Sequence, residues 1–469
     1  MTARTTAKSA QGAQSAQANP TAQISLSASR GFSPLEPGFD GAGLFGYQDG
    51  VLTLDGVSAE ALASEYGTPS YILAQRVAEQ AYQRLANALS QAMDRDGSGR
   101  QRRICYAVKA NANHALLTAL ARQGAGADVV SVGEAKLALN AGFKAADIVF
   151  SGVGKHPDEI TEAIELGIGQ LNAESVEEIA VIDRCASAIN ATTTVALRVN
   201  PEVDARTHAK ISTGKKGDKF GIPIDQIIGA FKDLSSRPHL KAGGLAVHIG
   251  SQITDPEPFR QAFEKISGLV TAIRAEGLAI DHLDLGGGLG IRYQDESPIE
   301  PSAWATTIAD IALPLACDVT VEPGRYIAGP AGLLLAEVLY VKTAADRTIV
   351  ILDASMSELI RPSLYDAWHE VIPLRQPDPA VAYQPVDLVG PVCESGDTFA
   401  QNRMMPPLSV GDRVAFLTAG AYASVMASTY NARPLPPEII VADGKHHPVR
   451  PRLDLSQLIP GQSLPDWLE

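Results

Sequence analysis

The residue with the clearest chemical potential is Lys109, in the stretch Tyr106–Asn111. It follows the apolar run Ile104–Val108, which predicts a buried strand, and it precedes a helical pattern that begins at His114. The amine of such a lysine points into the mouth of whatever the strand helps to build. In a dry pocket its pKa would fall, and the neutral amine could form a Schiff base. Most lysines at strand ends are simply solvated, so this interpretation depends on partners elsewhere in the chain.

Three later stretches supply such partners, each at the end of a predicted strand: His248–Gln252, Gly286–Gly290 and Glu322–Arg325. A glycine run lets backbone N–H groups approach a phosphate, and an arginine after the next strand favours the same ligand. The glutamate could keep a pyridine nitrogen protonated, and the histidine could stack on a planar ring. The alternatives are turn glycines, a surface carboxylate beside the arginine, and a hydrogen-bonded structural histidine. Taken together with the lysine, the set indicates pyridoxal phosphate.

The elements that must position these residues alternate between strand and helix from about Tyr71 to Arg325. The predicted strands are Ile104–Val108, Ala127–Ser131, Asp147–Ser151, Gly169–Asn172, Val195–Asn200, Gly244–Ile249, His282–Leu285 and Asp318–Glu322. Helical patterns between them include Gly133–Ala141, Pro157–Leu166, Val176–Ala188 and Pro258–Ala275. Such alternation predicts a parallel sheet of the α/β class, and eight units predict a closed, TIM-like (β/α)8 barrel with its chemistry at the carboxyl ends of the strands.

After Arg325 the pattern changes to strands separated by Pro, Gly and Asp turns, without clear amphipathic helices between them. The predicted strands are Val338–Lys342, Thr348–Leu352, Val386–Val389, Arg413–Leu417 and Glu438–Val441. This pattern predicts a C-terminal, mostly antiparallel β domain. A further strand at Gly50–Gly56 resembles these, so we expect it to pair with that domain. The expected organisation is a disordered tail at 1–40, a strand segment at 41–68, the barrel at 69–328 and the β domain at 329–469.

The composition is that of an ordinary soluble globular protein, with 45% hydrophobic and 20% charged residues. A length of 469 residues favours two domains. The net charge of -14 argues against a nucleic-acid partner or an anionic membrane surface. No apolar run approaches the roughly 20 residues that span a bilayer.

The first thirty residues are rich in Ala, Thr, Ser and Gln, which predicts disorder, and they lack the apolar core of a secretory signal. A transit peptide stays open, because no acidic residue precedes Glu36. The four cysteines show no close, metal-like spacing. We therefore expect no metal site and a reducing, cytoplasmic setting.

From about Gly50 to Val441 the chain resembles the alanine-racemase-like barrel family of pyridoxal-phosphate enzymes, and within it the diaminopimelate decarboxylases. Beside the strand-end stretches above, the motifs that carry the resemblance are Tyr106–Asn113, Asp128–Ser131, Gly133–Glu134, Arg198–Pro201, Ile211–Gly214, Lys219–Gly221, Leu359–Tyr365, Cys393–Asp397 and Gly420–Tyr422. The resemblance implies decarboxylation of meso-2,6-diaminopimelate to L-lysine and carbon dioxide, the last step of lysine biosynthesis. Pyridoxal phosphate is the cofactor that it implies.

The resemblance also implies a role for each matching residue. Lys109 corresponds to the Schiff-base lysine, and Cys393 to the general acid that reprotonates the carbanion. The cofactor-binding set is Lys109, His248, Ser251, Gly287, Gly288, Glu322, Gly324, Arg325 and Tyr422, and the substrate-binding set is Arg325, Arg361, Tyr365, Glu394 and Tyr422. Arginines suit the remote carboxylate of the substrate and a glutamate suits its ammonium group. In this family Cys393 and its neighbours enter the active site of the other subunit, which implies an obligate homodimer with shared active sites.

Three other interpretations keep the fold. A decarboxylase of another basic amino acid, such as ornithine, arginine or carboxynorspermidine, would have no use for the Arg361 carboxylate clamp. An aspartate follows the catalytic cysteine in the ornithine-type relatives, whereas Glu394 does here. A non-catalytic homologue would have lost Lys109 or Cys393, and an alanine racemase would leave the Cys393–Glu394 pair without a role.

Three positions depart from the family's common pattern. Ser355 and Ser357 replace a glycine and an asparagine, and Ala423 stands where glycine is frequent. None of these changes removes a charged group, so they bear on fine substrate preference rather than on the chemistry.

Overall fold

The computed structural model describes residues 44–205, 213–214, 217–344, 346–458 and 463–468. The tail expected at 1–40 lies outside the described residues. So do Ile211 and Ser212 of one family motif.

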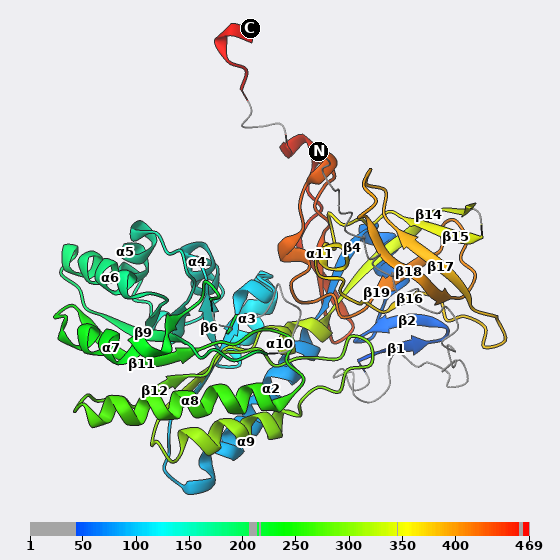
Figure 1. Ribbon diagram of the computed structural model, residues 1–469. Helices are drawn as coiled ribbons and strands as arrows, with labels where there is room; N and C mark the ends of the chain where they lie inside the picture. Colours follow the sequence, from blue (N-terminus) through cyan, green and yellow to red (C-terminus); the bar gives the residue numbers. More distant parts are fainter. Residues whose placement is uncertain (1–43, 206–212, 215–216, 345, 459–462, 469) are drawn as a thin grey trace, which may run out of the picture.

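Eight parallel strands form a closed barrel in the half of the molecule that holds the cyan to green elements (Figure 1). They are β5 (Arg102–Ala107), β6 (Gly126–Val129), β7 (Ile148–Phe150), β8 (Gln170–Ala173), β9 (Thr193–Asn200), β11 (Leu240–Val247), β12 (His282–Asp284) and β13 (Asp318–Val321). The pairing of β8 with β9 and of β13 with β5 completes the ring, and the short β10 (Ile222–Pro223) pairs with β9. All eight predicted barrel strands are confirmed.

Helices surround the barrel, and at several strand ends a capping residue begins the next helix. Ser131 accepts a hydrogen bond from the Glu134 N–H, and Ser175 does the same for the Glu178 N–H, so α4 and α6 begin directly after their strands. The helices are α2 (Gln75–Met93), α3 (His114–Arg122), α4 (Val132–Asn140), α5 (Pro157–Glu165), α6 (Val176–Ala188), α7 (Ile227–Ser236), α8 (Pro256–Ala275), α9 (Pro301–Ala312) and the short α10 (Arg325–Ala328). The four predicted helical stretches are confirmed.

The second unit, called the β domain here, is built around a mixed sheet in the order β18-β17-β15-β14-β4-β20-β21, with β19 joining β14 to β16. Its strands are β4 (Ser70–Ala74), β14 (Gly332–Ala344), β15 (Arg347–Leu352), β16 (Val371–Pro373), β17 (Gln384–Val389), β18 (Thr398–Met405), β19 (Arg413–Phe416), β20 (Glu438–Ala442) and β21 (Lys445–Arg450). Only the β15–β17 and β20–β4 pairs are parallel, so the mostly antiparallel prediction is confirmed for this sheet. The short α11 (Arg361–Tyr365) follows β15.

Two N-terminal segments lie differently from the simplest reading of the sequence. The strand β4 sits between β14 and β20 in the β domain, although the strand–helix alternation had placed Tyr71 at the start of the barrel. The expected strand near Gly50 is β2 (Val51–Leu54), which forms its own small sheet with β1 (Phe45–Gln48) and β3 (Val57–Ser58), followed by α1 (Ala59–Tyr66). It contacts the β domain as expected, because the Leu52 N–H donates to the Leu374 carbonyl at 2.8 Å. No helix among the described residues is long and apolar enough to cross a membrane.

Candidate active site

The predicted reactive lysine lies at the carboxyl end of the barrel. Lys109 occupies a 3₁₀ turn (Val108–Ala110) directly after β5, and its amine forms an ion pair with Asp128 of the neighbouring β6. Burial alone would lower the pKa of Lys109, but the nearby Asp128, Tyr422 and Glu322 raise that pKa above its ordinary value. The expected fall in the pKa is therefore wrong for this chain. Its amine is a cation because a fully buried carboxylate faces it.

A pair of buried carboxyl groups lies at the ends of the next strands around the ring. Glu322, after β13, is hydrogen-bonded to Asp284 of β12, and its Oε1 atom has no hydrogen-bond partner. Burial, followed by the charges of Asp128 and Asp284, raises the pKa of Glu322 well above its ordinary value. Asp284 is anchored by the Asn172 Nδ2 amide at 3.2 Å and the Gly286 N–H at 3.1 Å. Glu322 thus binds a proton more tightly than a free glutamate does, and its Oε1 atom is left for a ligand.

The glycine run packs so closely on the barrel rim that side chains would not fit. A Cβ on Gly287 would lie 2.1 Å from the Glu322 carbonyl, and one on Gly288 would lie 2.6 Å from the Gly250 carbonyl. The Gly287 N–H donates to Nδ1 of His248 at 3.2 Å, which leaves the hydrogen on the other ring nitrogen. Burial, together with Arg198 and Lys109, lowers the pKa of His248 well below its usual range. A neutral, fixed ring beside a glycine backbone without side chains suits a flat, phosphorylated ligand.

Arg325 is held by neutral oxygens. It is 6% exposed at the start of α10, and its Nε and Nη2 atoms donate to the Ser251 hydroxyl at 3.2 and 3.1 Å. Nη1 donates to the Tyr293 hydroxyl at 2.6 Å, and the guanidinium also lies 4.8 Å from the Tyr422 ring. Tyr422 is tied to the Lys109 turn, because its N–H donates to the Ala110 carbonyl at 2.8 Å. These contacts join Ser251, Arg325, Tyr422 and Lys109 in one region, as the sequence predicted.

Arg361, from α11 of the β domain, contacts Tyr293 as well. It is 5% exposed, and its guanidinium lies 4.6 Å from the Tyr293 ring centre. Its Nη1 donates to Nε2 of His369 at 2.7 Å, whereas its Nε has no partner. Burial and the charge of Arg325 lower the pKa of Arg361. Tyr365, at the end of the same helix, is half-buried and its phenol contributes to the electrostatic field at Arg361.

Cys393 and Glu394 lie elsewhere. Both are exposed in the loop between β17 and β18, where Glu394 accepts a hydrogen bond from the Tyr430 hydroxyl. Across the described part of the chain, no hydrogen bond or ion pair connects this loop to the residues around Lys109. The hydrogen bonds and ion pairs of one chain therefore join most of the predicted set and do not include these two residues. Their loop is tied to α11 instead, because the Ser363 hydroxyl donates to the Gly396 carbonyl at 2.6 Å.

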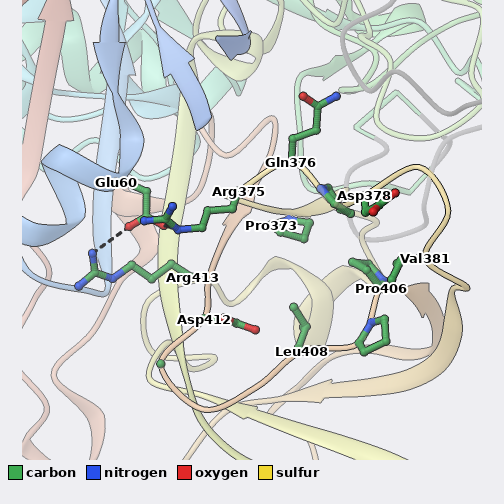
Figure 2. Close-up of a pocket in the computed structure, with 13 residues that line it drawn as sticks. Glu60, Pro373, Arg375, Gln376, Asp378, Val381, Pro406, Leu408, Asp412 and Arg413 are labelled. Carbon is green, nitrogen blue, oxygen red and sulfur yellow. Dashed lines mark hydrogen bonds and ion pairs between the residues drawn. The ribbon is translucent and has the colours of Figure 1, made fainter. Parts of the chain in front are cut away.

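A pocket of about 260 Å³ in the β domain is lined by none of the predicted residues (Figure 2). Its two arginines are already neutralised: Arg413 pairs with Glu60 and Glu337 at 3.1 Å each, and Arg375 pairs with Glu60 at 3.4 Å. The rest of its wall is largely proline and aliphatic side chain. It differs from the region around Lys109, where Glu322 Oε1 and Arg361 Nε lack hydrogen-bond partners.

The cluster around Lys109 fits pyridoxal phosphate. A Lys amine, an unpartnered Glu322 oxygen, a neutral flat His248 and a glycine backbone beside Arg325 are the donors and acceptors that an aldehyde-bearing, phosphorylated pyridine needs. Buried polar atoms are normally hydrogen-bonded, so the free Glu322 Oε1 atom indicates a ligand that supplies its partner.

Comparisons with known proteins agree with this chemistry. Residues 80–329 match the family described as "Pyridoxal-dependent decarboxylase, pyridoxal binding domain". The diaminopimelate decarboxylase of Zymomonas mobilis is 42% identical over 90% of this chain and 99% of its own, and that of Pseudomonas aeruginosa is 42% identical over 90% and 99%. The chain belongs to the diaminopimelate decarboxylase family. Its cofactor is pyridoxal phosphate, and it is an enzyme of the carboxy-lyase type.

Solved structures of the same family share the fold. The Helicobacter pylori diaminopimelate decarboxylase complexed with L-lysine has a TM-score of 0.81 and 38% identity, over 85% of this chain and 98% of that chain. The M. jannaschii diaminopimelate decarboxylase in complex with L-lysine has a TM-score of 0.86 and 33% identity, over 92% of this chain and 100% of that chain. The closed barrel with a separate mixed sheet is thus the architecture of the family.

One of the three departures from the family pattern, Ser355, has a local explanation. The Ser355 hydroxyl donates to Glu358 Oε2 at 2.6 Å and accepts from the Ser357 N–H at 3.0 Å, so this serine closes a buried turn. The Ser357 hydroxyl itself is buried without a partner among the described atoms. Ala423 is buried next to Tyr422 and adds one methyl group there.

Sequence reasoning missed four residues of the site: Asp128, Asp284, Tyr293 and His369. The first lay inside a recognised motif but was given no role. The second interrupts an otherwise apolar strand, Leu283–Leu285, directly before the glycines, which is a signal that the sequence contains. The other two do not lie at the carboxyl ends of barrel strands, which is where the sequence analysis looked for site residues.

Proposed function

We propose that the protein decarboxylates meso-2,6-diaminopimelate to L-lysine, the last step of lysine biosynthesis. One observation within this chain supports the choice of substrate. Arg325 and Arg361 are buried side by side against Tyr293, and no carboxylate of the described residues pairs with either. Two buried cations with only neutral partners favour an anion between them. Diaminopimelate presents a carboxylate at the end remote from the reaction, whereas ornithine and arginine present only a cation there.

We assign the cofactor-side roles in the same proposal, and the contacts described above support them. Bound pyridoxal phosphate supplies a protonated ring that takes up the electron pair left by the departing carboxylate. Lys109 is the residue that attaches it, His248 lies against the ring, and Glu322 holds a proton at the ring nitrogen through its free oxygen. Ser251, Gly287, Gly288, Gly324 and Arg325 provide the phosphate side, and Tyr422 borders both cofactor and substrate.

The proton that replaces the lost carboxylate comes from Cys393 in this proposal. Its Sγ–H donates to the substrate carbon, as a thiol can near neutral pH. Glu394, which follows it, receives the ammonium group at the remote end of the substrate. Because both residues are exposed and lie outside the site of their own chain, they are free to serve a second copy. The protein is then a homodimer with shared active sites.

The four unpaired cysteines support a reducing, cytoplasmic location. Cys393 is exposed and must stay a thiol to donate its proton. Cys105, Cys185 and Cys317 are buried and unpaired.

The experiment is a product assay on the full chain, loaded with pyridoxal phosphate and given meso-diaminopimelate, ornithine or arginine. We expect carbon dioxide and lysine from the first substrate only, abolished in Lys109→Ala and kept in Lys136→Ala, whose lysine is exposed on α4. Turnover of ornithine instead would sink the proposed substrate.

Shared sites are tested by mixing two inactive variants, Lys109→Ala and Cys393→Ala. In a mixed dimer one site receives Lys109 from one subunit and Cys393 from the other, so activity should return to about a quarter of the wild-type rate after random exchange. No recovery, with exchange proved by differently tagged subunits, would show that each chain uses its own cysteine.

A further inference from the structure

Tyr293 contacts both arginines that lack a carboxylate partner, and His369 contacts one of them, Arg361. We propose that the tyrosine and the histidine are specificity-determining positioning residues, which hold Arg325 and Arg361 as a clamp spaced for the remote carboxylate of the substrate. The proposal rests on the proposed function and adds to it two residues from outside the barrel's strand ends.

Tyr293 spaces the two cations. It is buried in the loop after the glycine run, and its hydroxyl accepts the 2.6 Å hydrogen bond from Arg325 Nη1. Arg361 lies over its ring at 4.6 Å from the centre, and Arg325 lies at 5.7 Å. The electron-rich face of an aromatic ring attracts guanidinium groups, which offsets their mutual repulsion. A single side chain therefore fixes both guanidinium positions.

His369 holds Arg361 from behind. Its ring is 2% exposed, and Nε2 accepts from Arg361 Nη1 at 2.7 Å. The other nitrogen, Nδ1, lies 2.9 Å from the Leu417 carbonyl. Because a guanidinium cannot accept and a carbonyl cannot donate, the ring must be neutral with its hydrogen on Nδ1. Its edge meets the Tyr293 ring at 5.6 Å and 83°, so the tether and the spacer also pack on each other.

The charges around His369 make the tether depend on pH. Burial first, and then Arg361, Arg325 and Arg403, lower the pKa of His369 well below its usual range, while the hydrogen bond to Leu417 partly opposes this. Glu370 is the nearby acid, and it pairs with Arg403 at 3.7 Å. A protonated ring would turn an N–H toward the N–H of Arg361 and add a third positive charge. The clamp is therefore intact only while His369 is neutral.

A rigid clamp explains selection between similar ligands. L-lysine, the product, keeps the remote carboxylate, whereas cadaverine has the same carbon chain and terminal amines without it. When both arginines are fixed, the carboxylate of lysine accepts the hydrogen bonds that the guanidinium groups gave to water. Cadaverine has no carboxylate and leaves two buried cations unpaired. Loosening the frame should therefore weaken the binding of lysine and leave that of cadaverine unchanged.

The test measures binding of L-lysine and cadaverine to the cofactor-loaded enzyme by calorimetry, alongside steady-state kinetics. In Tyr293→Phe and His369→Leu we expect lysine affinity to fall about tenfold and KM for diaminopimelate to rise by a similar factor, with kcat changed far less. We expect kcat/KM of the wild type to fall at acid pH, as His369 becomes protonated. His369→Gln keeps an acceptor without a titrating ring, so it should bind lysine as the wild type does and lack that fall. Tyr340→Phe on β14 and His447→Leu on β21, both exposed, are matched controls.

Three results would overturn the clamp. One is wild-type lysine affinity in both Tyr293→Phe and His369→Leu. Another is equal loss of lysine and cadaverine binding, which would mean general damage to the site. The third is a His369→Gln variant as weak as His369→Leu. A failure of the proposed function is seen separately, because wild-type protein would then not turn over diaminopimelate at all.

Discussion

Replacing Asp284 by asparagine should weaken the proton-holding part of the site without changing its volume. Asp284 is 1% exposed, and its two oxygens accept from the Gly286 N–H at 3.1 Å and from Asn172 Nδ2 at 3.2 Å. An asparagine has one accepting and one donating end. Whichever way its amide turns, one of those two N–H groups faces another N–H. A buried donor left unpaired costs about 1–3 kcal/mol, so the free energy of unfolding should fall by that amount.

The second effect of Asp284→Asn is on pH dependence. Burial and neighbouring charges raise the pKa of Glu322 well above its ordinary value, and Asp284 is one cause. A group with a raised pKa in the folded state binds its proton more tightly there than when unfolded. Its contribution to stability is fully present below the unfolded pKa and is lost as pH rises through the folded pKa. The substitution lowers the pKa of Glu322 and also removes Asp284, whose own pKa is raised. The loss of stability with rising pH should therefore shrink by up to about 1.4 kcal/mol per pH unit.

Urea denaturation of the cofactor-free protein between pH 5 and pH 8 measures both effects. A titration with pyridoxal phosphate, followed by its absorbance, should show about tenfold weaker binding, because the Glu322 carboxyl loses the Asp284 carboxyl that is hydrogen-bonded to it. Asp387→Asn is the matched control. That buried acid lies in the β domain, where it accepts from the Asn402 N–H at 2.8 Å and pairs with Arg347. Its loss should lower stability and leave cofactor affinity unchanged. Wild-type pH slope and wild-type cofactor affinity in Asp284→Asn would refute the reasoning.

Three further substitutions have definite expected outcomes. In Gly287→Ala the new Cβ would lie 2.1 Å from the Glu322 carbonyl, so cofactor affinity should fall at least about tenfold while circular dichroism shows an intact fold; Gly268→Ala on α8, with open space around it, should bind normally. Glu174→Gln leaves Arg198, its ion-pair partner at 2.5 Å, buried without a counter-charge, and should cost about 3–5 kcal/mol in chemical denaturation; a loss below about 1 kcal/mol would contradict this. Ser355→Gly removes the 2.6 Å hydrogen bond to Glu358 and should cost about 1 kcal/mol of stability at unchanged kcat/KM.

The barrel could be predicted because its strands pair mostly with neighbours in sequence. Most are short apolar runs followed by a helix, which a capping residue such as Ser131 or Ser175 begins in several cases, so local pattern and final pairing agree. The strand β4 has the same local pattern, yet its partners β14 and β20 come from the far end of the chain. Nothing in its own residues distinguishes the two outcomes, and that is why the pattern misplaced it.

In the site, the sequence located residues by their place at strand ends but not by their surroundings. Lys109, Glu322 and Arg325 were identified in this way. The direction of the Lys109 pKa was wrong because it depends on Asp128, which stands opposite β5 in the register of β6. Tyr293 and His369 could not be found by this rule, since only tertiary packing brings a loop of the barrel against α11 and its flanking turn.

The place of β4 between β14 and β20 also governs how the chain can be made and divided. Both of its partners follow the whole barrel in sequence, so during synthesis β4 leaves the ribosome long before either edge can be covered. The barrel therefore folds while β4, which precedes it in the chain, still lacks both of its partner strands. A shortened chain of residues 44–331 would contain every barrel strand and leave β4 with two bare edges. We expect that fragment in the insoluble fraction on expression, whereas removal of residues 44–74 from it should return a larger soluble share.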